Sequence, residues 1–195
     1  MSRTHSWRRV LPALALLAAI VAAGSLALLD GSSKPALPGG VQQSAPAAGF
    51  DGTLAQYRGK AVFVTFLYAN CPDVCPLMAS NLRVALNLLG KRASQAQLIA
   101  VSVDPRGDTP AAVARFVRSH ELRGRMQYLI GSAGELARTW KAWSVGSTRD
   151  AEQPQLVSHD ALVYGISASG KLMTFYPDSF EPREIAHDVQ RLLAR

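Results

Sequence analysis

The sequence predicts an α/β sandwich in which helices cover both faces of a central mixed β-sheet. Apolar, β-branched runs alternate with segments of helical periodicity, the chain then forms a hairpin pattern, and an amphipathic helix pattern closes it. Alternating strands and helices favour parallel pairing, whereas a hairpin adds antiparallel strands. Both kinds of pairing are therefore expected in one sheet.

Before this domain, residues 10–29 predict a transmembrane anchor. The run has no charged residue, three arginines precede it, and Asp30 follows it. About 20 apolar residues can cross a bilayer, and the positive flank keeps residues 1–9 in the cytoplasm. A cleaved signal peptide is the alternative because small residues occur at 22–25, but the run exceeds the usual signal core of about 7–15 residues. The expected location is the bacterial inner membrane, with the domain in the periplasm.

Residues 30–49 predict a flexible linker, since Gly, Ser, Pro and Ala dominate without a usable period. The domain proper is expected over residues 50–195, a length that can bury a core of its own.

The charge of the chain is +7, of which residues 1–30 supply a net +2. The basic residues are spread out except for one arginine group, Arg115, Arg118, Arg123 and Arg125. No basic stripe interleaved with aromatic residues is present, so nucleic acid is not an expected partner. The arginine group reads as a solvated helix edge, or as a contact for an acidic partner protein.

The elements of the domain follow from hydrophobic period and turn chemistry. We expect a short edge element at 53–57 and strands at 61–68, 98–103 and 126–130, with a hairpin made by 161–166 and 171–176. Helices are expected after the cysteine pair up to Gly90, over 110–119, from Ser132 through Trp143, and from Pro182 onward.

Both cysteines lie in the turn Cys71-Pro-Asp-Val-Cys75-Pro76, between the first buried strand and a helix. Pro76 suits the first helical position, which places Cys75 at or next to the N-cap. Free amide groups and the helix dipole there predict a lowered Cys75 pKa. Two close thiolates can cycle with a disulfide or hold a soft metal ion. A purely structural disulfide is less favoured, because so short a loop removes little entropy from the unfolded chain.

The chain resembles the Sco/SenC family of thioredoxin-like, membrane-anchored copper chaperones. The resemblance covers residues 58–193, and the cysteine turn is its most specific part. The other matching pieces are Arg58-Gly-Lys60, Val101-Ser-Val-Asp-Pro105, Asp108-Thr-Pro110 and the single histidine His159. It implies a thioredoxin-like fold and assembly of the CuA centre of cytochrome c oxidase. The implied partners are the copper-site subunit of that enzyme and a copper donor or thiol reductant.

The metal site that the resemblance implies consists of Cys71, Cys75 and His159. Two thiolates and one imidazole suit Cu(I), and Cu(II) if an oxygen ligand joins. A closed zinc site would need a fourth protein ligand, and the chain has no third cysteine. The family usually has an acidic residue before the histidine and a small hydroxyl residue after it, whereas the order here is Ser158-His159-Asp160.

A thiol-disulfide oxidoreductase is the alternative function, with Cys71 and Cys75 as the redox pair. It differs from the chaperone over His159, which metal retention needs and disulfide exchange does not. A peroxidase would need an arginine beside the thiolate, and none lies near the pair in sequence. Asp104 and Asp108 read as turn and cap residues that need not meet the thiols, with Asp108 or Thr109 as the cap of the helix at 110–119. Trp140 and Trp143 read as packing residues.

Overall fold

A computed structural model of the chain describes residues 41–46 and 53–195, to which the structural statements below refer. The predicted anchor, 10–29, and the preceding residues 1–9 lie outside these ranges. No helix within the described ranges is long and apolar enough to span a bilayer.

The domain is built on a six-stranded mixed sheet with the strand order β1-β8-β7-β2-β3-β4. Strands β2, β3 and β4 run parallel to one another, whereas β7, β8 and β1 pair antiparallel. The strands are β1 (Val41–Pro46), β2 (Ala61–Leu67), β3 (Ala96–Ser102), β4 (Met126–Leu129), β7 (Leu162–Ile166) and β8 (Lys171–Pro177). The predicted mixed sheet is confirmed.

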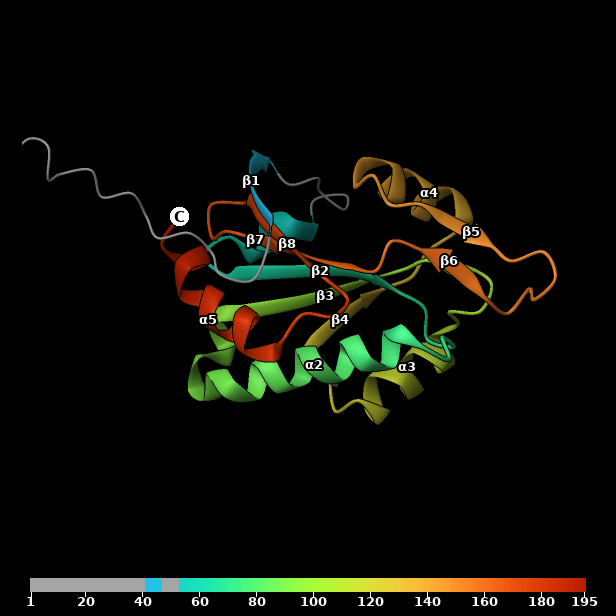
Figure 1. Cartoon of the computed structure of the whole chain (residues 1–195), viewed down its shortest axis with the longest axis horizontal. Coiled ribbons are helices and arrows are strands. Elements are labelled where there is room, and N and C mark those ends of the chain that lie inside the picture. Colours follow the sequence, from blue (N-terminus) through green and yellow to red (C-terminus); the bar gives the residue numbers. More distant parts are fainter. Residues whose placement is uncertain (1–40, 47–52) are drawn as a thin grey trace, which may run out of the picture. The chain divides into compact units, whose positions relative to one another are not determined.

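The helices cover both faces of this sheet. Figure 1 shows α2 (Val74–Leu89), α3 (Pro110–Ser119) and α5 (Pro182–Leu193) on one side and α4 (Ala133–Ala142) on the other. Because β2, β3 and β4 succeed one another in the same direction, their right-handed crossovers place α2 and α3 on the same face. Ser132 and Glu135 form the capping box that starts α4, as the sequence predicts.

The core lies around β2 and β3, which are almost wholly buried and have no alternating pattern. Strands covered on both faces are apolar throughout, which explains why the run 61–67 reads as continuous. Trp143 packs against Phe66 and Tyr164 from the α4 side, so the predicted packing role of this residue is confirmed.

Several elements differ from the sequence expectation. Val41–Pro46, within the predicted linker, pairs with β8 as strand β1, since the edge of the hairpin offers backbone groups that outweigh a weak local pattern. Residues Thr53–Tyr57, where a short edge element was expected, form a 3-10 helix. A second 3-10 helix, η3 (Gly90–Gln95), and a small hairpin of β5 (Ser147–Arg149) and β6 (Val157–His159) were not predicted.

Candidate functional site

The cysteine turn joins the carboxyl end of β2 to the start of α2. The helix begins at Val74, with Asp73 as its N-cap, so Cys75 lies inside the first turn rather than at the cap. Cys75 is fully buried and Cys71 is 8% exposed, and both are free thiols. The two sulfurs interact by a hydrogen bond.

This geometry separates the two thiols in proton affinity. The hydrogen bond from Cys75 and the backbone N–H groups of Asp73 and Cys75 lower the pKa of Cys71 to about 5, against the opposing effect of burial. The same hydrogen bond, together with burial, raises the pKa of Cys75. The predicted lowering of the Cys75 pKa is therefore wrong. The amides at the helix start act on the cysteine of the preceding loop, because Cys75 itself points into the core.

His159 approaches the cysteine pair from the end of β6. Its Nε2 lies 3.8 Å from the Cys75 Sγ, although the two residues are 84 positions apart. Its Nδ1 lies 3.2 Å from the Asp160 carbonyl oxygen. A carbonyl oxygen only accepts, so Nδ1 carries the proton and the Nε2 lone pair faces the sulfur. Burial lowers the pKa of His159 and thus favours this neutral form.

The turn that carries His159 is held by the side chain of Asp160, whose Oδ2 accepts a 2.8 Å hydrogen bond from the Gly146 N–H. The imidazole is thus oriented by the carbonyl of Asp160 and not by its carboxylate. Asp160 lies where the family usually has a small hydroxyl residue, and this hydrogen bond holds the backbone next to His159 in place.

The donor set fits a soft metal ion. With bonds of the length known for zinc, about 2.3 Å to sulfur and about 2.0 Å to nitrogen, an ion bound by both atoms would require them to lie no more than about 4.3 Å apart. The observed separation of Cys75 Sγ and His159 Nε2 is 3.8 Å. As the side chains stand, the described residues contain no group of three or more His, Cys, Asp or Glu gathered as a metal site. Cys75 contacts both Cys71 and His159. Binding of one ion by all three residues therefore requires Cys71 and His159 to approach each other.

Two supporting residues were missed by sequence reasoning. Tyr68 follows β2 and is 3% exposed; it is hydrogen-bonded to Cys71 and packs edge-on against the His159 ring. Burial raises the pKa of Tyr68 to about 12. Its place at the end of the strand, three residues before Cys71, is the signal that would have found it.

Asp108 is the other missed residue. Its Oδ1 accepts a 2.7 Å hydrogen bond from the Ala69 N–H, two residues before Cys71. The cap of α3 is Thr109, whose hydroxyl accepts from the Ala112 N–H. Asp104 acts in its own turn, as predicted, by accepting from the N–H groups of Arg106 and Gly107, and it also pairs with Arg149.

Comparison with known proteins gives one consistent family. The SCO1/SenC family model matches residues 46–194. The bovine protein named Protein SCO2 homolog, mitochondrial, is 29% identical over 145 residues, which are 72% of this chain and 54% of that protein. The chain thus spans about half the length of this relative.

Solved structures agree on the fold. Bradyrhizobium japonicum ScoI, whose structure has copper bound, is 26% identical with a TM-score of 0.62, over 80% of this chain and 99% of that one. Apo Sco1 from Thermus thermophilus is 24% identical with a TM-score of 0.67, over 83% and 99% of the two chains. The predicted thioredoxin-like α/β architecture is confirmed by these likenesses.

Proposed function

The chain belongs to the SCO1/SenC family, and from this premise we propose that it is a copper metallochaperone that helps to assemble the CuA centre of cytochrome c oxidase. Copper is its cargo, held by Cys71, Cys75 and His159. The predicted anchor would keep the domain at the bacterial inner membrane, facing the periplasm. The copper-site subunit of the oxidase is the proposed acceptor, and a copper donor or a thiol reductant acts before it.

The contact between Cys75 and His159 is the observation that carries this proposal. A redox pair needs no imidazole, yet this histidine presents an unprotonated Nε2 to the sulfur and is held by its own backbone contact. Two sulfurs and one nitrogen suit Cu(I), which binds few ligands and prefers soft ones. A low-coordinate ion leaves room for an incoming cysteine of the acceptor, so copper can move by exchange of thiolates.

Disulfide exchange is the second candidate, and the unequal thiols favour it. Cys71, with its lowered pKa, is the thiolate that attacks a client disulfide, and Cys75 resolves the mixed disulfide. The client disulfide gains two electrons as the Cys71–Cys75 pair is oxidised. The two functions are compatible, since a client must have reduced cysteines before copper can enter.

Anaerobic Cu(I) titration against a chromophoric chelator tests the proposal. We expect one tightly held Cu(I) per chain, a marked loss of affinity in His159→Ala, and no retention in Cys71→Ser or Cys75→Ser. His120→Ala is the matched control, because this histidine hydrogen-bonds to the Phe116 carbonyl and Ser119 within α3 and its C-cap.

Unchanged copper affinity in His159→Ala would contradict the proposed site. If that variant also exchanged disulfides at the wild-type rate, the oxidoreductase would be the better description of the protein.

A further inference from the structure

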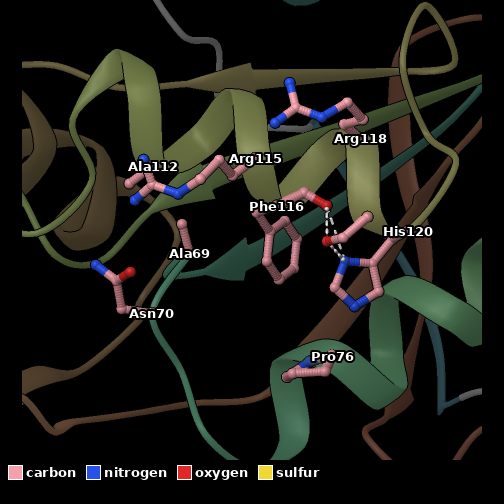
Figure 2. A pocket seen from close by; sticks show the side chains of 9 residues that line it. Ala69, Asn70, Pro76, Ala112, Arg115, Phe116, Arg118 and His120 are labelled. Atoms are coloured by element: carbon pink, nitrogen blue, oxygen red, sulfur yellow. Dashed lines mark hydrogen bonds between the residues drawn. The ribbon is translucent and has the colours of Figure 1, made fainter.

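A pocket adjoins the cysteine turn, and His159 is not among the residues that line it. It has a volume of about 430 Å³ and lies between the turn and α3. From the turn it is lined by Ala69, Asn70 and Pro76, which flank the two cysteines in sequence. Figure 2 shows α3 and its C-terminal end across from Pro76, with the Phe116 ring between them. The residues that α3 and its end contribute are Ala112, Arg115, Phe116, Arg118, Ser119 and His120.

The charge of this pocket is entirely positive. Arg115 and Arg118 are both exposed, and no Asp or Glu is among the described residues that line the pocket. Within the described ranges neither guanidinium has an ion-pair or hydrogen-bond partner. Other arginines of the domain are paired, such as Arg83 with Glu121 and Arg149 with Asp104. The two charges at the pocket are thus available to an external anion.

The floor of the pocket is apolar and fixed. Phe116 is only 4% exposed, and its ring lies 4.4 Å from that of His120. The His120 Nδ1 donates to the Phe116 carbonyl at 2.8 Å, which holds the imidazole against the helix end. Ala112 and Pro76 add further apolar surface. A ligand that combines a negative group with an apolar side chain matches this surface.

From this geometry we propose that the pocket binds a segment of a protein partner in which a carboxylate side chain adjoins an aromatic or aliphatic one. The guanidinium forks of Arg115 and Arg118 take the carboxylate, and the apolar side chain lies over Phe116. A concave pocket with an apolar floor suits a protruding peptide side chain better than a flat lipid surface. The identification of the partner as a copper acceptor rests on the proposed function. The recognition of a carboxylate beside an apolar side chain is independent of that function.

The pocket lies next to the thiols, because three of its lining residues belong to the cysteine turn. A segment bound there lies beside the turn that carries Cys71 and Cys75, so the partner is positioned next to the thiols before any exchange occurs. Opposite charges also speed the encounter of two proteins, and salt weakens this effect.

Fluorescence anisotropy with labelled decapeptides tests the pocket directly. The full-length, copper-free chain in neutral detergent is titrated with peptides that differ only in a central Glu-Phe, Gln-Phe or Glu-Ser pair. We expect saturable, salt-sensitive binding of the Glu-Phe peptide and weaker binding of the other two. The Arg115→Gln/Arg118→Gln variant should raise the Kd about tenfold or more, since two charge-assisted contacts are lost.

Arg123→Gln/Arg138→Gln is the matched control, because it removes the same charge from exposed residues that do not line the pocket. Equal weakening by both double variants would reduce the effect to net charge and overturn the inference, as would no saturable binding by the wild type. Binding to phosphatidylglycerol nanodiscs that is lost in Arg115→Gln/Arg118→Gln, with no peptide preference, would assign the pocket to a membrane surface instead.

Copper titration of the same variants separates this inference from the proposed function. We expect Arg115→Gln/Arg118→Gln to hold Cu(I) as the wild type does. A chain that binds the Glu-Phe peptide but no copper would refute the chaperone and leave the pocket standing; the reverse result would refute only the pocket.

Discussion

The Asp108 carboxylate accepts a 2.7 Å hydrogen bond from the Ala69 N–H, and this contact joins the loop after β3 to the loop that carries the thiols. Its other oxygen accepts a 2.9 Å hydrogen bond from the Tyr128 hydroxyl of β4. The carboxyl ends of parallel strands meet at one edge of a sheet, so three neighbouring strand ends are tied at a single buried side chain. The Asp108 side chain thereby holds the cysteine turn in place against the loop after β3.

Replacement of Asp108 by Ala should lower the free energy of unfolding by about 1–3 kcal/mol, because a buried amide and a buried hydroxyl lose their acceptor. Asp108→Asn should cost less, since its Oδ1 still accepts from Ala69. Urea unfolding followed by circular dichroism measures both. Equal losses in the two variants would show that the charge, rather than the acceptor atoms, is what matters.

The pH dependence of Asp108 has a defined sign. Burial raises its pKa above the ordinary value of 3.8, so the folded protein keeps this proton longer than the unfolded chain does. Its contribution to stability is fully present below pH 3.8 and is lost as pH rises through the folded pKa. We expect the stability of the wild type relative to Asp108→Asn to fall over this interval and then level off. A difference that rises with pH would contradict the buried carboxyl.

Gly107 lies in the loop after β3, next to Asp108, where a side chain has no room. A Cβ there would lie within 3.0 Å of the Asp104 Cγ and 3.3 Å of the Asn70 Nδ2. Gly107→Ala should therefore destabilise the protein by about 1–3 kcal/mol through overpacking. Because Asn70 precedes Cys71, the alkylation rate of Cys71 should change as well.

Gly134→Ala is the control for Gly107. Gly134 lies in the exposed first turn of α4, and only the end of the Arg138 side chain comes within 4.0 Å of a Cβ there. Alanine in a helix is favoured over glycine, so this variant should gain up to about 1 kcal/mol. Thermal unfolding of the two variants side by side would expose any error, since the expected shifts have opposite signs.

The sequence predicts those parts of the fold whose signal is local. The β2 run, the capping box at Ser132 and the proline at the start of α5 are all formed by residues close in sequence, and each element occurs as expected. The β5–β6 hairpin was not predicted because its strands have three residues each, too few to show a period. Strand β1 was not predicted because its formation depends on pairing with β8, more than a hundred residues away in sequence.

The site shows the same division. The cysteine turn was predicted from its residue types and spacing, and His159 was predicted from the family resemblance. That Cys71 and not Cys75 has the lowered pKa could not be predicted, since it depends on which sulfur faces the amides of Asp73 and Cys75. A shift of the helix start by two residues is within the usual uncertainty of helix ends, yet it decides this point.

The side chain of Asp160 should matter for copper as a hydrogen-bond acceptor and not as a charge. Asp160→Ala frees the Gly146 N–H and loosens the turn on which His159 stands, so Cu(I) affinity should fall about tenfold or more. Asp160→Asn keeps an acceptor oxygen and should stay near wild type. Competition with a Cu(I) chelator measures both. Similar losses in the two variants would point to the negative charge instead.

The unequal thiols should be visible in alkylation at a pH where an ordinary thiol is inert. With a pKa of about 5, Cys71 is mostly thiolate at pH 6, whereas Cys75 stays protonated and buried. Iodoacetamide should therefore modify Cys71 first, and the rate should fall as pH drops through about 5. Peptide mass spectrometry identifies the modified residue and gives its rate.

Cys75→Ala removes the hydrogen bond that contributes most to the low Cys71 pKa. The pKa of Cys71 should rise in this variant, and its alkylation at pH 6 should slow about tenfold, because only the thiolate reacts. Cys71→Ser is the complementary control, in which the remaining Cys75 should react far more slowly than Cys71 does in the wild type. Faster alkylation of Cys75 than of Cys71 in the wild type would reverse the assignment, since the helix-start amides would then act on the buried sulfur.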